Sequence, residues 1–296
     1  MDFKPIDISM KQMVEHYTAK WKLECSEYTF SNLLMWGCGG NIMLAEDEQA
    51  LYILLHWGNE RFMFAPLTVE PESEYYQTAL DKAEEYMSTH GIDPIFKGIS
   101  GPIKAAFERC TGYELIDDRN NSDYVYTMES LRDLAGKKLH AKRNHIHQFM
   151  AQYGERYEYV KITGDMMGEC VDVYNEWLSE KSPDETDNME LCAIKTLLMH
   201  MDVLGIRGGG IRIDGKLAAF TLGQKMDDNM AVVHIEKADN EIMGLYTVIN
   251  NQFVQHELTD VKFINREEDM GMEGLRKAKL SYYPAYMIDK FDGRSI

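Results

Sequence analysis

The sequence predicts a mixed α/β fold built from two similar units in tandem, and three observations support this prediction. Short segments rich in β-branched and aromatic residues alternate with segments whose apolar residues recur every three to four positions. The order of these segments is similar in the two halves of the chain. A length of 296 residues with 45% hydrophobic residues is sufficient for one large domain or two of ordinary size.

The first half, residues 1–130, is expected to form one unit. Residues 10–36 have a helical pattern that ends at Gly37, and a second helix is expected between Pro71 and Gly91, which suit a helix start and a helix stop. A short third helix is expected at 103–110. Strands are expected at 41–44, 50–57, 61–67, 94–99, 113–116 and 124–128.

The segment 131–156 differs from its surroundings because it carries the densest basic cluster of an acidic protein. Lys137, Lys138, Lys142 and Arg143 all fall within it, interleaved with histidines. Residues 131–153 are expected to form one helix that bridges the two units. The histidine spacings of five and two residues do not suit a metal site, so no bound metal is expected.

The second half, residues 157–296, is expected to form the other unit. The Asp214-Gly215 pair predicts a tight hairpin turn. A polar, proline-containing loop is expected at 179–187. Strands are expected at 157–162, 211–213, 217–222, 231–238, 261–264 and 285–290. Helices are expected at 165–178, 189–204, 244–253 and 270–281.

Composition limits the partners. The net charge of −18 opposes long-range attraction to nucleic acid and to anionic lipid, so DNA is not an expected partner. No stretch approaches the roughly 20 apolar residues of a membrane span. The N-terminal residues lack the charged-then-apolar pattern of a signal peptide, and we expect a cytoplasmic protein.

Two stretches of the sequence carry a resemblance to a known family. The first is Gly-Lys-Lys-Leu-His-Ala-Lys-Arg-Asn-His-Ile at 136–146. The second is Phe-Ile-Asn-Arg-Glu-Glu-Asp at 263–269, continuing through Gly-Leu-Arg-Lys-Ala-Lys at 274–279 to Ser-Tyr-Tyr-Pro at 281–284. Together they resemble the DUF2156 family, which is related to the C-terminal catalytic domain of phosphatidylglycerol lysyltransferases. That family has a duplicated acetyltransferase-like (GNAT) fold.

The resemblance implies transfer of an acyl or aminoacyl group from a CoA-type or tRNA-type donor to an amine or hydroxyl. No further cofactor is implied: acyl-CoA or aminoacyl-tRNA would be a substrate. The lysyltransferases also carry a large membrane-embedded N-terminal region that has no counterpart in these 296 residues. A small molecule or aminoacyl-tRNA is therefore the expected substrate. The oligomeric state is left open.

In GNAT proteins one central strand diverges from its neighbour, the acyl donor lies in the gap, and the donor phosphates bind at the start of the next helix. The resemblance assigns these roles to strand 231–238 and to a donor-binding turn at Met243, Gly244, Leu245 and Tyr246. A helix N-terminus suits phosphate. Nearby acidic residues would repel a pyrophosphate, so an ordinary strand-to-helix turn is the alternative.

Candidate catalytic residues lie on the same strand and near the end of the chain. His234 and Glu236 are two positions apart and share one side of the strand. We expect Glu236 to be the base that takes a proton from the attacking acceptor, in direct attack without a covalent enzyme intermediate. The alternative is a structural polar pair. Tyr282 is a candidate proton donor, with core packing as the alternative.

Candidate substrate-binding residues come from two places. Asn265, Arg266 and Glu267 follow a strand end, where ligands gather in open α/β sheets; the alternative is a solvated loop. The basic helix contributes a face that suits RNA or phosphate, or that instead neutralises acidic neighbours. Its candidate residues are Lys138, Lys142, Arg143, Asn144 and His145.

The leading hypothesis is therefore an acyl- or aminoacyltransferase. A non-catalytic ligand-binding module that keeps the acetyltransferase-like fold is the main alternative, and a peptide-branching aminoacyltransferase is a further one.

Overall fold

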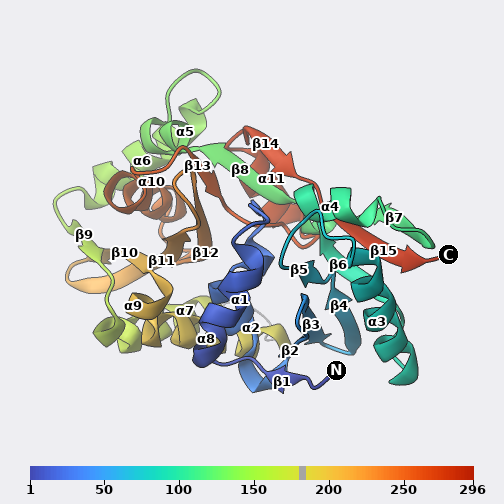
Figure 1. Cartoon of the computed structure of the whole chain (residues 1–296). Coiled ribbons are helices and arrows are strands. Elements are labelled where there is room, and N and C mark those ends of the chain that lie inside the picture. The colour runs from blue at the N-terminus through green and yellow to red at the C-terminus, as the bar shows by residue number, and fades with distance from the viewer. Residues whose placement is uncertain (180–184) are drawn as a thin grey trace. The chain divides into compact units, whose positions relative to one another are not determined.

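The computed structural model describes residues 1–179 and 185–296. It divides the chain into two compact units, Met1–Asp123 together with Ile288–Ile296, and Tyr124–Met287. Each unit contains one mixed β-sheet with helices (Figure 1). The expected unit boundaries after residues 130 and 156 were wrong, because residues 124–156 belong to the second unit and the last nine residues to the first.

The first unit has the strand order β1-β2-β3-β4-β6-β15-β7, with β5 paired to β3. Its strands are β1 Lys4–Pro5, β2 Ile42–Glu46, β3 Ala50–Trp57, β4 Glu60–Phe64, β5 Leu67–Thr68, β6 Ile95–Ile99, β7 Tyr113–Asp117 and β15 Phe291–Ser295. Its α-helices are α1 Lys11–Thr18, α2 Phe30–Trp36, α3 Tyr76–Thr89 and α4 Gly101–Phe107. The expected meander β2-β3-β4 is present and antiparallel.

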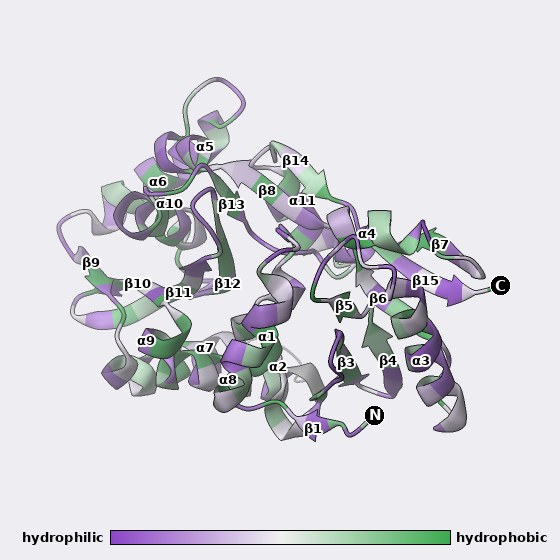
Figure 2. Ribbon diagram, in the orientation of Figure 1, coloured by the Kyte–Doolittle hydropathy of each residue, from purple (hydrophilic) through white to green (hydrophobic). Residues whose placement is uncertain are grey.

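The centre of this sheet is hydrophobic because β3 is apolar along most of its length. Residues 50–55 of β3 are all buried, and the strand is mostly green in Figure 2. A strand buried on both faces needs neighbours on both faces, and helix α1, which contacts β3, supplies part of that cover.

Strand β15 was not predicted. The expected last strand at 285–290 proved to be β14, Tyr286–Ile288, which belongs to the second sheet. The chain then enters the first sheet, where β15 lies antiparallel between β6 and β7, with Phe291 opposite both Ile99 and Asp117. Strand β15 was missed because its partner residues are about 170 residues or more away in sequence, and such distant pairing produces no local sequence pattern.

The second unit has the strand order β14-β8-β13-β12-β11-β10-β9. Its other strands are β8 Asp123–Thr127, β9 Tyr157–Lys161, β10 Ile206–Ile213, β11 Lys216–Lys225, β12 Met230–Ala238 and β13 Phe263–Asn265. Its α-helices are α5 Met128–Asp133, α6 His140–Tyr153, α7 Met167–Ser179, α8 Glu185–Met199, α9 Met201–Leu204, α10 Leu245–Glu257 and α11 Glu273–Leu280. Of the expected loop at 179–187, residues 180–184 lie outside the described residues.

The basic segment is not one bridging helix. It is split into α5 and α6, because Leu134 and Gly136 adopt positive φ angles of 48° and 83° that interrupt a helix. Both helices belong to the second unit. Phe149 of α6 is buried in a cluster with Leu245 and Val248, so α6 packs along α10. In the part of the chain that the structure describes, no helix has the length and apolarity to span a bilayer.

Candidate functional site

Strand β12 has a neighbour on one side along only part of its length. It pairs in parallel with β13 from Met230↔Phe263 to Val232↔Asn265. Strand β13 ends at Asn265, whereas β12 continues to Ala238. Parallel pairing therefore stops at Val232, and the second half of β12 extends beyond the end of β13. Both His234 and Glu236 lie on this half.

A β-bulge orients these two side chains. In the pairing of β11 with β12, Leu222 is opposite Ile235 and Gly223 is opposite Val233, so His234 is skipped. A bulge shifts the alternation of side chains by one residue and is common next to functional sites. Val233 before the bulge packs with Phe253 of α10, and Glu236 after it accepts a hydrogen bond from Asn250 of the same helix.

Two side-chain bridges cross the gap where main-chain pairing stops. His234 Nδ1 lies 2.8 Å from Glu267 Oε1, and Arg266 Nη2 donates to Glu236 Oε1 at 3.0 Å. These side chains are 0% to 15% exposed. Hydrogen bonds to charged groups in such an environment are strong and hold their partners in fixed positions. The polar residues after β13 therefore face β12 and not solvent.

The loop after β13 has an unusual backbone that a buried lysine holds in place. Glu267 has φ +57°, a conformation that is uncommon for a residue with a side chain. Its N–H donates to Asn265 Oδ1 at 2.7 Å. Lys279 of α11 is buried and donates to the backbone carbonyls of Arg266, Glu267 and Glu268. The ammonium thus satisfies three carbonyls of one turn.

Asp269 anchors the far end of this loop. Its carboxylate accepts two hydrogen bonds from Arg276 at 2.8 Å, one from the Tyr124 hydroxyl at 2.5 Å and one from the Gly271 N–H at 2.9 Å. Burial alone would raise the pKa of Asp269, but these hydrogen bonds stabilise the charged form and lower the pKa to about 2.

Tyr282 lies between the loop and helix α6. It is buried at 5% exposure, and its ring lies 5.0 Å from the Arg266 guanidinium and 3.8 Å from Lys142 Nζ. Burial raises the pKa of Tyr282, against the effect of Arg266. Burial together with Arg266 lowers the pKa of Lys142 to about 8, against the effect of Glu236.

Three buried polar atoms in this cluster have no hydrogen-bond partner among the described residues. They are His234 Nε2, Arg266 Nη1 and Asn250 Oδ1. A buried polar atom without a partner costs about 1 to 3 kcal/mol, so three in one cluster point to groups that a ligand or water satisfies. The cluster has one acceptor, one donor and one imidazole nitrogen, which suits a ligand with both donors and acceptors.

The expected donor-binding turn has a different arrangement. Leu245 is fully buried, Met243 is 63% exposed, and burial raises the pKa of Tyr246 to about 12. Gly244 has φ +85°, and a Cβ there would lie 2.4 Å from the backbone oxygen of His145. Any larger residue at position 244 would therefore clash with the backbone of α6, so a glycine is required there. The acidic side chain of Asp239 caps its own loop through the Glu241 N–H at 2.8 Å.

The residues of the basic helix have separate environments. Lys142 faces Tyr282, and Lys138 Nζ lies 5.3 Å from the Tyr283 ring. Arg143 donates to the carbonyls of Leu134 and Gly136, so it stabilises the turn between α5 and α6.

The two remaining candidates of this helix contact different neighbours. Asn144 is exposed and contacts His140 at 3.3 Å. His145 Nδ1 lies 3.4 Å from Thr247 Oγ1, and burial together with Lys142 lowers its pKa.

Sequence reasoning missed three members of the site: Asn250, Lys279 and Tyr126, whose ring lies 5.7 Å from the Arg266 guanidinium. Asn250 and Lys279 are polar residues in helical segments whose burial depends on tertiary packing. The only available signal was for Lys279, which falls in the second stretch that carries the family resemblance.

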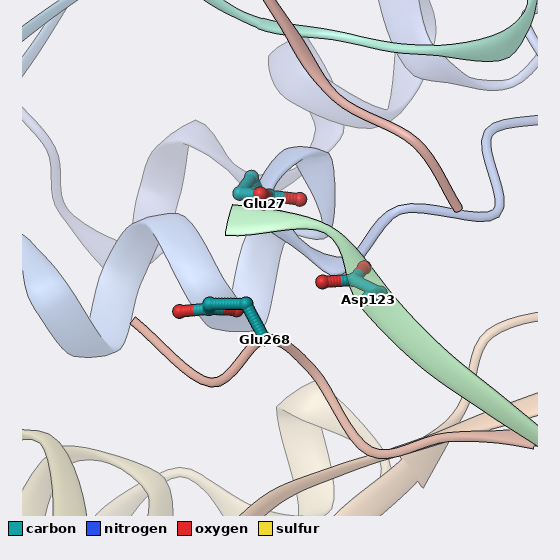
Figure 3. Close-up of side chains that lie close together, drawn as sticks. All are labelled: Glu27, Asp123 and Glu268. Carbon is teal, nitrogen blue, oxygen red and sulfur yellow. The ribbon is translucent and has the colours of Figure 1, made fainter. Parts of the chain in front are cut away.

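A separate acidic pair lies in the first unit. Figure 3 labels the carboxylates of Glu27 and Asp123. Within the first unit, Lys290 forms ion pairs with both Glu27 and Asp123, the latter at 2.6 Å. The ammonium occupies the space between the two carboxylates, and this pair is best described as a buried ion-pair cluster.

Comparison with known structures identifies the fold class. The chain has a TM-score of 0.55 and 11% identity to a tandem GNAT protein from the clavulanic acid biosynthesis pathway, covering 99% of this chain and 98% of that one. The fold is therefore that of tandem acetyltransferase-like proteins. The paired sheets, each with a parallel strand pair at its centre, are consistent with it.

The family follows from the sequence. The model for the phosphatidylglycerol lysyltransferase C-terminal family matches residues 19–292, and the chain belongs to that family. A conserved protein of unknown function from Bacteroides thetaiotaomicron has 31% identity and a TM-score of 0.88, with 100% of both chains covered. The C-terminal DUF2156 domain of a putative lysylphosphatidylglycerol synthetase from Agrobacterium fabrum has 14% identity and a TM-score of 0.66, with 97% and 92% covered.

A curated relative covers less of the chain. An uncharacterized protein of Mycoplasmoides gallisepticum is 25% identical over 182 residues, which are 58% of this chain and 56% of that protein. The match thus spans little more than half of the relative's length.

Proposed function

We propose that the second unit is an aminoacyltransferase that moves an aminoacyl group from an activated RNA ester to an amine or hydroxyl of a small acceptor. Membership of the lysyltransferase family supports the reaction class. The observation that carries the proposal is the buried polar cluster on the half of β12 that extends beyond β13, where three polar atoms have no partner among the described residues. A site of this kind holds a reacting group away from bulk water.

In this proposal His234 is the base, in place of Glu236. A carboxylate only accepts hydrogen bonds, so His234 Nδ1 donates to Glu267 and leaves Nε2 with a free lone pair. Both oxygens of Glu236 are already engaged, one by Arg266 and one by Asn250. Glu236 then positions Arg266.

The reaction step is a direct transfer. The acceptor nitrogen or oxygen attacks the ester carbonyl carbon, and its proton passes to His234 Nε2. The bond between the carbonyl carbon and the ribose oxygen then breaks, and the proton moves from His234 to that oxygen. No redox change occurs and no covalent enzyme intermediate forms, since the same imidazole acts first as base and then as acid.

An RNA ester is favoured over acyl-CoA for two reasons. The gap beside β12, which would hold the thioester arm, is crossed by the Arg266–Glu236 and His234–Glu267 bridges. The start of α10, which would hold the pyrophosphate, is approached closely by the backbone of α6 at Gly244. Met243, Gly244, Leu245 and Tyr246 then form a packing turn, and no cofactor is required.

The alternative function is a binding module without catalysis, and the same two bridges favour it. A gap closed by ion pairs is compatible with ligand binding at the cluster without transfer.

Single-turnover transfer distinguishes the two functions. The full chain is mixed with charged tRNA and a panel of amine and hydroxyl acceptors, and loss of the ester is followed with and without acceptor. We expect acceptor-dependent loss that falls at least about 100-fold in His234→Gln. The matched control is His256→Gln, an exposed histidine of α10 that stacks on Tyr159. Stabilisation by charged tRNA without any transfer would support the binding module instead.

A further inference from the structure

Among the described residues, the ammonium of Lys142 forms no direct ion pair. Lys142 is partly buried, and among the described residues it forms neither a hydrogen bond nor an ion pair; its contact is with the face of the Tyr282 ring at 3.8 Å. Burial of a cation that no carboxylate contacts directly is unfavourable. Burial therefore lowers the pKa of Lys142 to about 8, with a further contribution from Arg266 and against the effect of Glu236. An anion bound at Nζ would remove this penalty.

A second unsatisfied donor lies over the same ring. The Arg266 guanidinium is 5.0 Å from the Tyr282 ring centroid, and its side chain is 11% exposed. Its Nη2 is used by Glu236, whereas Nη1 is buried without a partner. Glu236 therefore faces two cations, Arg266 and Lys142, of which only Arg266 forms an ion pair with it among the described residues.

The next residue offers an aromatic surface of the kind that stacks on bases. Tyr283 is 51% exposed and has φ +57°, an uncommon conformation that turns it differently from the buried Tyr282. Lys138, in the turn that precedes α6, lies over the Tyr283 ring. An exposed aromatic ring beside lysines is typical of surfaces that bind single-stranded nucleic acid.

We propose that Lys142 and Arg266 bind a phosphate of a single-stranded RNA end, and that the base next to this phosphate stacks on Tyr283. The inference rests on the proposed function, because it assigns the donor's terminal nucleotide to named residues of the same unit. The two cations come from different elements, α6 and the loop after β13, and both lie by the Tyr282 ring.

Adenosine 5′-monophosphate and adenosine are the probes, since they share the base and ribose and differ by the phosphate. Equilibrium binding to the full chain is measured by calorimetry at constant ionic strength. We expect the monophosphate to bind about tenfold more tightly than adenosine, and this ratio to fall to about one in Lys142→Met. Tyr283→Ala is expected to weaken both probes by the same factor and leave the ratio unchanged.

The matched control is Lys277→Met, which removes an equal charge from the exposed face of α11. It is expected to keep the tenfold ratio, because screening weakens a distant surface charge. Equal binding of both probes to the native protein would overturn the phosphate site. An unchanged ratio in Lys142→Met would overturn the assignment to Lys142. Preference for glycerol 3-phosphate over the nucleotide would overturn the RNA assignment in favour of a lipid headgroup.

The binding experiment and the transfer experiment test the phosphate site and the proposed function independently. A Lys142-dependent ratio without any transfer would retain the phosphate site and reject the aminoacyltransferase. Transfer from charged tRNA without a Lys142-dependent affinity ratio would retain the aminoacyltransferase and reject the phosphate site.

Discussion

The second unit contains a parallel strand pair, β12 with β13, and the first unit contains a similar pair, β4 with β6. Each parallel pair with the side chains around it is called a crossing below, and the two crossings differ in the kind of side chain that surrounds them. In the first unit β4, the third strand of the meander, pairs in parallel with β6 at Met63↔Phe96 and Phe64↔Lys97. Beside this crossing, Gly98 lies against the rings of Tyr28 and Phe64. The ring centroids of Phe62 and Phe64 are 6.2 Å apart. The first crossing is thus packed with aromatic rings, whereas the second contains charged and polar side chains.

The same backbone arrangement therefore serves packing in the first unit and, under the proposed function, group transfer in the second. An apolar crossing gains stability from burial and needs no partners. A polar crossing is stable only when each group has its partner, and the atoms left without one in the second unit mark where a substrate completes the network. This difference, more than the shared topology, locates the proposed site.

Removing one member of the Arg266–Glu236 bridge should have the largest effect. Arg266→Met leaves the Glu236 carboxylate buried without its cation, which typically costs about 3 to 5 kcal/mol. We expect a loss of this size in the free energy of unfolding, measured by denaturant titration, and a loss of transfer.

The double substitution Glu236→Met and Arg266→Met makes the second crossing resemble the first. We expect stability to return to within about 1 kcal/mol of the native protein, because an apolar pair of similar volume replaces the ion pair. Transfer should not return. Recovered transfer would show that the bridge serves packing only.

Asp269→Asn should have the next largest effect, about 2 to 3 kcal/mol, because a neutral amide cannot accept the hydrogen bonds of Arg276 and Tyr124 equally well. The native pKa is lowered from 3.8 to about 2, so this stabilisation is present above about pH 4 and is lost as pH falls towards 2. The stability difference between native and variant protein should therefore narrow over that range. A difference that is constant from pH 7 to pH 2 would contradict this account.

Lys279→Met tests the loop that has no equivalent contact in the aromatic crossing. Three carbonyls would lose their common donor, and we expect a cost of about 2 kcal/mol. Hydrogen exchange should increase at residues 266–269, since their turn is held by this ammonium. Lys277→Met, two residues earlier and exposed, is the control and should leave both measurements unchanged.

The sequence was sufficient to predict the repeated α/β units because periodicity and turn residues act locally. The prediction that His234 and Glu236 share a side of their strand assumed regular alternation, which the β-bulge at His234 interrupts. The sequence did not predict that Arg266 and Glu267 reach across to them, because that depends on where β13 ends and on the left-handed turn at Glu267. The boundary of the units was wrong for a similar reason: β8 and β15 each join the sheet of the other half of the chain, and no local pattern records that exchange.

The smallest effect is expected in the first unit. Phe64 is 8% exposed and packs near Tyr28 in the aromatic crossing. Phe64→Leu shortens a buried side chain and should cost about 1 kcal/mol, since the surroundings can close partly around leucine. If the aromatic crossing serves packing alone, this variant should bind adenosine 5′-monophosphate as the native protein does and transfer at the same rate. A weakened nucleotide affinity at unchanged stability would mean that the first crossing also contributes to the site, and the contrast between the two crossings would then no longer locate the chemistry.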